Sequence, residues 1–309
     1  MLSRREMLAV MGASLARAAA AEDRLKICVF SKHFQWTDWR EASELAAQIG
    51  FDGIDYTVRT GGHVLPERVK QDLPKAVEIA HKAGLETPMI TAGIVDTSSP
   101  HAEAILETAN GLGIKHYRWG GFKYDYGRSI AEQLNELQPK VHALAELNAK
   151  YGMAAMYHTH SGLREVGAPI WDVWTLLKNE DPRYVGVNYD IGHATVEGGY
   201  GGWVDSAHLV GPYMRGVALK DFLWGKNAKG AWVPQWCAAG KGMVNFPAFF
   251  ELLKTAKFSG PVQLHFEYPE LGGANDGKTQ LEIPKERVVA IMKRDLQYVK
   301  GLMSAAQLV

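Results

Sequence analysis

The 309-residue sequence has only two cysteines, Cys28 and Cys237, and a formal net charge of zero. Two cysteines cannot form a disulfide scaffold, and their places in an apolar segment and in a loop region predict two free thiols. No long basic run occurs, so the charge gives no support to a nucleic-acid partner. The hydrophobic content of 47% and the charged content of 22% are those of a globular protein that buries a substantial core.

The sequence also lacks an apolar run long enough to span a bilayer. Near the N-terminus, a short Ala-rich stretch contains Arg17 and is preceded by the adjacent residues Arg4 and Arg5. A charged start, a short apolar centre and small residues at the exit resemble a cleavable export signal of the twin-arginine type. We therefore expect residues 1–21 to be a signal and residues 22–309 to be one domain, exported to the periplasm or the extracellular space of a bacterium. An amphipathic surface helix is the alternative for this segment.

One stretch, residues 184–193, shows how the rest of the chain is organised. Apolar residues alternate there with Gly186, Asn188 and Asp190, which is the period of a β-strand with two different faces. The strand closes on an aspartate, and His193 follows three residues later. A carboxylate and an imidazole therefore stand at one end of one strand.

Strand-like and helix-like segments alternate along the whole chain from about Leu25. The predicted strands cover residues 26–30, 50–56, 87–92, 114–120, 153–160, 184–193, 215–221 and 261–268, and the clearest helices cover 38–49, 66–83 and 283–303. Eight such units favour the α/β class and a (β/α)8 TIM barrel in a single domain. An open doubly wound sheet is the alternative, but it normally has a glycine-rich turn after its first strand, where this chain has residues 31–34, Ser-Lys-His-Phe.

Polar residues gather at the ends of the last four predicted strands. Active sites of such barrels lie at the carboxyl ends of the strands, and alternate residues point inward. By this parity the inward-facing polar residues are His158, His160, Asn188, Asp190, Lys220, Gln263, His265 and Glu267. Any one of them alone is compatible with an ordinary core or strand-end role. Together they predict a site, because burying so many polar groups without a ligand is costly. Such a His, Asp and Glu set suits a divalent ion such as Mn, Zn, Co, Fe or Mg.

Several segments resemble the xylose isomerase-like barrel family of sugar isomerases and epimerases, which is related to endonuclease IV. These segments are residues 50–55 (GFDGID), 190–193 (DIGH), 219–221 (LKD), 239–246 (AGKGMVNF) and 266–267 (FE). The resemblance covers nearly the whole chain after the predicted signal. It implies a divalent metal held by Glu, Asp, His and Glu from strands five to eight, and proton exchange by the two glutamates in the epimerases.

At two of these four positions the sequence departs from the family. Asp190 and Glu267 match, but His158 replaces the strand-five Glu and Ala218 replaces the strand-seven His. We expect His265 to compensate for Ala218, because it points into the same interior, so that the metal ligands are His158, Asp190, Glu267 and His265. Loss of metal binding is the alternative.

The basic groups not assigned to the metal are Lys220, His160 and His193, and these are the predicted catalytic residues. Lys220 is the expected base, since a neighbouring cation would make a lysine usable for proton removal. The residues expected to bind substrate are Asp55, Arg118, Trp119, Trp36, Asn188 and Trp224. Aromatic side chains suit the faces of sugar rings, and the sequence shows no arginine cluster for a phosphate, so we expect a neutral sugar.

The expected function is metal-dependent isomerisation or epimerisation of a sugar by proton abstraction next to a carbonyl group. The first alternative is a lyase that eliminates the aglycone of a 3-keto glycoside, because a single base is enough for that reaction. The second is an exported sugar-binding barrel without activity. Repair of DNA by an endonuclease IV-like chemistry is not expected, since neither a three-metal site nor a basic surface is evident. Whether the protein forms a homo-oligomer stays open.

Overall fold

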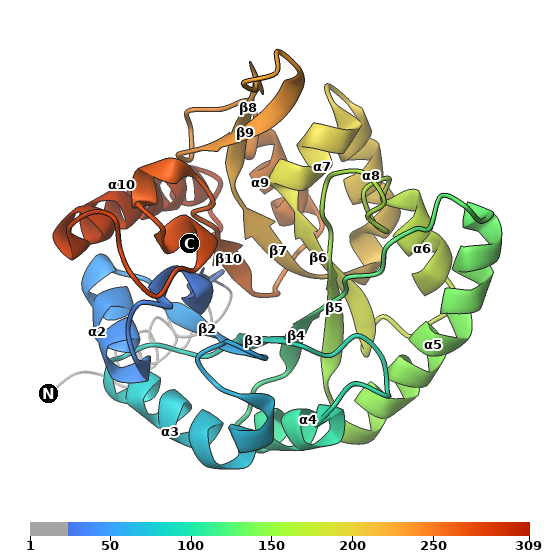
Figure 1. Cartoon of the computed structure of the whole chain (residues 1–309), viewed down its shortest axis with the longest axis horizontal. Coiled ribbons are helices and arrows are strands. Elements are labelled where there is room, and N and C mark those ends of the chain that lie inside the picture. Colours follow the sequence, from blue (N-terminus) through green and yellow to red (C-terminus); the bar gives the residue numbers. More distant parts are fainter. Residues whose placement is uncertain (1–23) are drawn as a thin grey trace, which may run out of the picture.

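A closed barrel of eight parallel strands forms the centre of the computed structural model, which describes residues 24–309 (Figure 1). The predicted signal at residues 1–21 lies outside the described residues. The barrel strands are β1 (Ile27–Phe30), β2 (Gly53–Val58), β3 (Met89–Ala92), β4 (His116–Trp119), β5 (Ala154–His158), β6 (Val185–Asp190), β7 (Met214–Leu219) and β10 (Val262–Leu264). The first strand pairs with both β2 and β10, which closes the barrel. The predicted (β/α)8 fold is confirmed.

Helices surround the barrel and cover its outer face (Figure 1). They are α2 (Trp39–Ile49), α3 (Val69–Lys82), α4 (Ala102–Gly111), α5 (Ile130–Tyr151), α6 (Trp171–Leu177), α7 (Ile191–Gly198), α8 (Gly202–Val210), α9 (Phe246–Thr255) and α10 (Lys285–Ala305). Short 3-10 turns are η1 (Ser31–Phe34), η2 (Pro66–Arg68), η3 (Gly211–Tyr213), η4 (Pro269–Leu271) and η5 (Ala274–Asp276). None of the described helices combines the length and the apolar character needed to cross a membrane.

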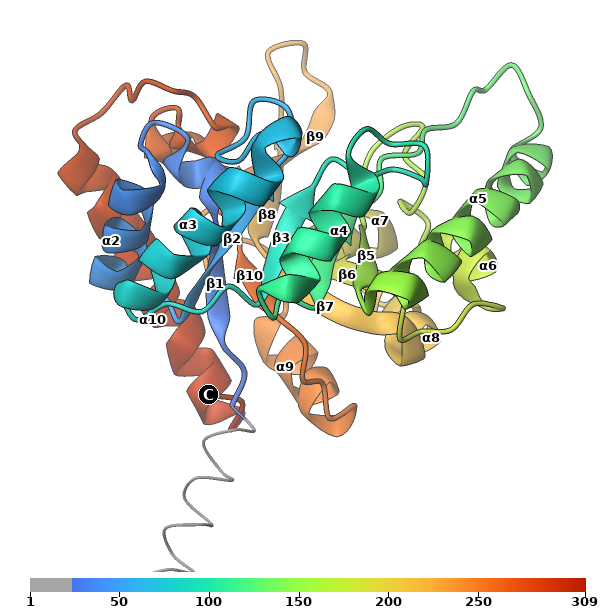
Figure 2. The ribbon, with the colours of Figure 1, turned by 90° about the horizontal axis from the view of Figure 1, so that it is seen from below.

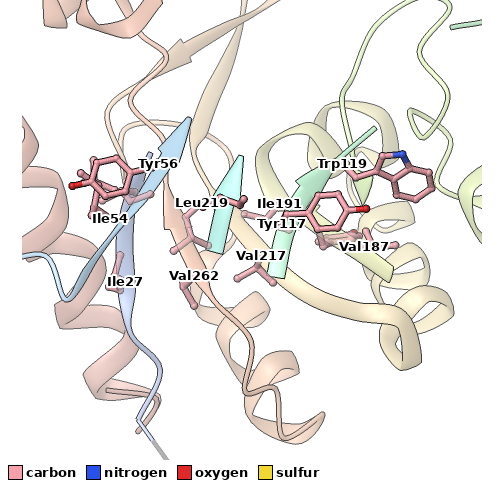
Figure 3. Packing of buried hydrophobic residues seen from close by; sticks show 14 of the residues in the cluster. Ile27, Ile54, Tyr56, Tyr117, Trp119, Val187, Ile191, Val217, Leu219 and Val262 are labelled. Carbon is pink, nitrogen blue, oxygen red and sulfur yellow. The ribbon is translucent and has the colours of Figure 1, made fainter. Parts of the chain in front are cut away.

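The strand parity predicted from the sequence determines where the apolar core lies. Val217 and Leu219 on β7 face the helix layer and are fully buried there with Ile54 and Tyr56 of β2 (Figure 3). This layer excludes water from the outer face of the barrel and holds the strands in register. Inside the barrel, the described residues include a separate small apolar cluster of Cys28, Met89 and Met156. Nearer the carboxyl ends of the strands the interior holds buried polar side chains such as His158, Asp190 and His265.

The segment after β7 is a β-hairpin that includes Cys237, so the placement of Cys237 in a loop region was wrong. Strands β8 (Asp221–Lys226) and β9 (Trp232–Cys237) pair in antiparallel fashion and project from the carboxyl end of the barrel (Figure 2). Asn227 shapes the turn, because its side chain accepts the amide protons of Lys229 and Ala231. Asp221 fixes the base of the hairpin by accepting backbone amides, among them those of Gly240 and Val244.

Candidate active site

Asp190 stands at the junction between β6 and α7. Its Oδ1 accepts the backbone N–H of His193 at 3.0 Å and so caps the helix, which explains the spacing of the aspartate and the histidine in the sequence. Its Oδ2 is buried and has no hydrogen-bond partner. Burial raises the pKa of Asp190 to about 6, although Lys220 opposes that shift. The free oxygen points into the barrel, where a ligand would satisfy it.

Two histidines face this free oxygen. Oδ2 of Asp190 lies 3.6 Å from Nε2 of His158 and 3.8 Å from Nδ1 of His265, and all three side chains are buried. Nδ1 of His158 and both ring nitrogens of His265 have no hydrogen-bond partner. Burial lowers the pKa of both histidines well below the ordinary value, so their rings are neutral and have a lone pair to offer. This donor set fits a divalent metal ion, because Asp190, His158 and His265 can each offer one ligand atom to a common ion and these atoms lie within 4.8 Å of one another.

Glu267, the fourth predicted ligand, is not part of this cluster. Its Oε1 lies 2.9 Å from Nζ of Lys32, and its Oε2 lies 2.7 Å from Nζ of Lys220. Burial alone would raise the pKa of Glu267, but Lys220, His265 and Lys32 lower it well below its usual value. Both oxygens of this carboxylate are therefore engaged by lysines. Among the described residues, the groups that could hold an ion are His158, Asp190 and His265, and also His158, His160 and His193.

Lys220 is buried at the mouth of the barrel and contacts several groups of the site. Its Nζ lies 2.6 Å from Nε2 of His193, 3.4 Å from Oδ2 of Asp190 and 4.1 Å from the centre of the Trp236 ring. Gly192 makes room for the lysine stem, because a Cβ atom there would lie 2.7 Å from Cγ of Lys220. The predicted catalytic residues Lys220 and His193 are thus in direct contact.

A second polar group lies on the opposite wall. Nη2 of Arg118 donates to Nε2 of His160 at 3.2 Å, and burial lowers the pKa of His160 to about 3. Asp55 accepts hydrogen bonds from Thr91 at 2.7 Å and from Gln263 at 2.5 Å, and burial raises its pKa to about 7. Asn188 donates to the same Gln263 at 2.5 Å. Asp55 and Asn188 therefore belong to a hydrogen-bonded layer of the interior.

A profile of the xylose isomerase-like TIM barrel family matches residues 43–288. The chain belongs to this family. Its fold is similar to a D-psicose 3-epimerase solved with D-tagatose from Clostridium cellulolyticum H10, with 14% identity, a TM-score of 0.64, and 90% of this chain and 99% of the other covered. It is also similar to a xylose isomerase-like TIM barrel protein from Mycobacterium smegmatis in complex with magnesium, with 14% identity, a TM-score of 0.65, and 92% and 98% covered. A comparison with curated proteins gave no match.

A third structure of similar fold is described as the probable 3-DHS dehydratase of Bacillus anthracis. It shares 15% identity at a TM-score of 0.63, and 89% of this chain and 99% of the other are covered. At such identities the likeness shows the fold of a family member and nothing of its substrate.

The three tryptophans predicted to bind substrate lie apart from this group. Trp119 is buried between the barrel and the helices, where its ring packs on Tyr157 and its Nε1 donates to the carbonyl oxygen of Val95. Trp36 is half-buried and donates to a backbone carbonyl of its own turn. Trp224 is 42% exposed on the hairpin.

Trp236, a residue missing from the predicted site, is the tryptophan that contacts it. Its ring centre lies 4.8 Å from that of His193. In the hairpin register Trp224 of β8 pairs with Pro234, two residues before Trp236 in β9, so both tryptophans share one face of the hairpin. Trp236 pairs with Phe222, nearer the barrel, and therefore reaches His193, whereas Trp224 lies further along the hairpin.

A cavity of about 250 Å³ opens beside His160 and His193, between the segment after β5 and helix α7. Its wall includes Ala168, Pro169, Ile170, Trp171, Glu197 and Gly198. Because it borders two of the predicted catalytic residues, it offers room for part of a substrate larger than the groups held at the barrel axis.

Proposed function

We propose that this protein is an enzyme that removes a proton from the carbon next to a carbonyl group of a carbohydrate, as sugar isomerases and epimerases do. The observation that carries the proposal is the contact of 2.6 Å between Lys220 and His193, beside the buried cluster of His158, Asp190 and His265. Such a proton abstraction needs a base that takes the proton and a group that polarises the carbonyl, and a base next to a metal-binding cluster can provide both. The proposal also draws on a relative of the same fold that is named a D-psicose 3-epimerase.

His158, Asp190 and His265 would hold a divalent ion. Two imidazoles and one carboxylate suit an ion of borderline preference such as Zn, Mn, Co or Fe more than they suit Mg, which prefers oxygen ligands. When bound, such an ion supplies Lewis acidity that polarises a substrate carbonyl and makes the neighbouring C–H more acidic.

The proton is taken up by the chain's own residues. The backbone N–H of Ser161 donates to Nδ1 of His193 at 3.0 Å, so the neutral ring carries its proton on Nε2, which faces Nζ of Lys220. Nζ accepts this proton's hydrogen bond in the neutral amine form of the lysine, which is also the form that acts as a base. The two nitrogens are therefore placed to pass a proton between them. Glu267 holds Lys220 in position through its Oε2, and the ring of Trp236 covers one side of Nζ.

An elimination is the second candidate, and two observations favour it. The strand-five position that holds a glutamate in the epimerases is His158, which faces Asp190 in the metal cluster, so a second carboxylate to exchange protons from the opposite face is missing among the site residues described here. The cavity beside His160 and His193 has room for a leaving group. Elimination next to a carbonyl needs a single base, which Lys220 supplies.

Deuterium exchange tests the proposal. The metal-loaded protein is incubated in D2O with keto sugars and 3-keto glycosides that it binds, and the products are followed by NMR. We expect deuterium at the carbon next to the carbonyl; an isomeric sugar identifies an isomerase or epimerase, and a released aglycone identifies a lyase. Binding of these compounds without any exchange or conversion would contradict an enzymatic function.

A further inference from the structure

Two arginines meet at the mouth of the barrel on the side of β1. Arg59 follows β2 and Arg118 lies in β4, and their guanidinium carbons are 5.7 Å and 5.3 Å from the centre of the Phe30 ring. Arg59 has the same strand parity as Asp55, which lies in the interior. The fold therefore assembles an arginine pair that the linear sequence does not display.

Neither guanidinium has an anionic partner among residues 24–309. No carboxylate of this part of the chain comes within 4.0 Å of Arg59 or Arg118, whereas many exposed lysines and arginines do form such pairs. Arg118 donates one hydrogen bond, to the neutral ring of His160, and its Nη1 is buried without any partner. Burial lowers the pKa of Arg118 to about 10, so it is still charged at neutral pH. A half-buried guanidinium with a buried, unpartnered Nη1 and no counterion within 4.0 Å is costly, and an anion from elsewhere would relieve that cost.

The nearby carboxylates do not pair with the two arginines. Both oxygens of Glu267 contact lysines, and Asp190 caps a helix and faces the metal cluster. Asp55 accepts from Thr91 and Gln263 through Oδ2, whereas its Oδ1 is buried without a hydrogen-bond partner and lies more than 4.0 Å from the nitrogens of both guanidinium groups. The raised pKa of Asp55 leaves it partly protonated at neutral pH. A divalent ion in the His158, Asp190 and His265 cluster would add further positive charge to the mouth.

We propose that Arg59 and Arg118 bind an anionic group of the substrate, which makes the substrate an acidic carbohydrate with a carboxylate or a phosphate. The inference rests on the proposed function and replaces the neutral sugar expected from the sequence. Planar guanidinium groups suit both anions, since two N–H donors can contact two oxygens at once. Arg118 contacts His160, and the ring of His160 lies 4.6 Å from that of His158. The anionic group would thus lie next to the cluster that faces the reacting carbonyl.

Binding of three sugars that differ only at carbon six tests this inference: D-glucose, D-glucuronate and D-glucose 6-phosphate. Their dissociation constants are measured by calorimetry on the full, metal-loaded protein. We expect at least one acidic sugar to bind about tenfold or more tightly than glucose, as one charge-assisted contact allows. The acidic sugar that binds more tightly shows whether the site prefers a carboxylate or a phosphate. Arg118→Gln and Arg59→Gln should each remove most of this preference, whereas Arg287→Gln, an exposed position on α10, should keep it.

Three results would overturn the inference: glucose binding as tightly as both acids, no binding of either acid, or a preference for acids that survives in both arginine variants. Thermal melting shows whether each variant is folded. If one arginine variant does not fold, the variant of the other arginine is used for the binding test. The readout needs no turnover, so it is separate from the deuterium exchange. A preference for acids without any exchange contradicts the enzyme but not the anion site, and exchange without the preference contradicts only the anion site.

Discussion

Nζ of Lys220 and Oε2 of Glu267 form an ion pair at 2.7 Å in the mouth of the barrel. The same Nζ lies 3.4 Å from Oδ2 of Asp190, so one lysine contacts both carboxylates that match the metal ligands of the family. Glu267 is further engaged by Lys32. We therefore propose that His158 and His265 bind the metal together with Asp190, and that Glu267 positions the base.

This division of roles gives the first prediction, which concerns the metal. Asp190→Ala should remove stoichiometric binding of Zn or Mn, because it deletes the one carboxylate of the cluster. Glu267→Gln should keep it, since its oxygens contact lysines. Metal content after loading and dialysis measures both. Retention of metal by Asp190→Ala, or its loss in Glu267→Gln, would show that the ligands are misassigned.

The second prediction concerns the pH dependence of stability through His33. Its Nε2 accepts the N–H of Phe266 and its Nδ1 contacts the carbonyl oxygen of Ala274, both at 3.1 Å, so the ring must be neutral. Burial, with Lys32, lowers its pKa to about 3 from 6.5. The unfolded chain therefore binds a proton between these values that the folded chain does not, and stability is lost as the pH falls.

As the pH falls from roughly 6 to 4, one buried histidine of this kind lowers the free energy of unfolding by about 1.4 kcal/mol per pH unit. His33→Gln should reduce the measured slope by about that amount in urea titrations. His208→Gln, at an exposed position of α8, is the control and should leave the slope unchanged. An unaltered slope in His33→Gln would mean that His33 is protonated in the folded protein.

The third prediction separates packing from binding among the tryptophans. Trp119 is 2% exposed and donates to the carbonyl oxygen of Val95, so Trp119→Leu should lower the free energy of unfolding by about 2–3 kcal/mol. Trp224→Leu, on the exposed hairpin, should change it by less than about 1 kcal/mol. Chemical unfolding measures both. Equal effects of the two substitutions would contradict the placement of Trp119 in the core.

The fourth prediction concerns export, which we propose from the sequence alone. Arg4→Lys combined with Arg5→Lys should keep the precursor in the cytoplasm of the producing cell, because twin-arginine signals depend on that pair. Fractionation and immunoblotting measure the location. Normal export of the double variant would refute the twin-arginine interpretation.

The barrel and much of the site were predictable because strand parity is a local property. Asp190, Lys220 and His265 alternate with apolar residues that face the helices, so their inward direction follows from the sequence. Strand parity also places Trp119 outside the barrel interior, because adjacent strand residues point to opposite faces and its neighbour Arg118 points inward. Assigning both residues to the substrate was therefore inconsistent with parity.

Other features depend on contacts between distant segments and were not predictable. Lys32 reaches Glu267 only because a 3-10 turn follows β1 directly. Trp236 reaches Lys220 because β8 and β9 pair as a hairpin, and the register of that pairing depends on the geometry of the turn at Asn227. The partners of Glu267 and the arginine pair around Phe30 likewise come from side chains on separate strands.

The central claim is that Lys220 transfers the substrate proton, and one isotope measurement tests it most directly. Lys220→Met is compared with Lys226→Met, an exposed lysine of the hairpin, for the rate of deuterium exchange at the carbon next to the carbonyl in D2O. Lys220→Met should keep the fold and the metal but slow the exchange by at least about a hundredfold, as expected for loss of a general base, while Lys226→Met exchanges at the normal rate. Normal exchange in Lys220→Met, together with its loss in His160→Ala, would contradict the claim and assign the base to His160.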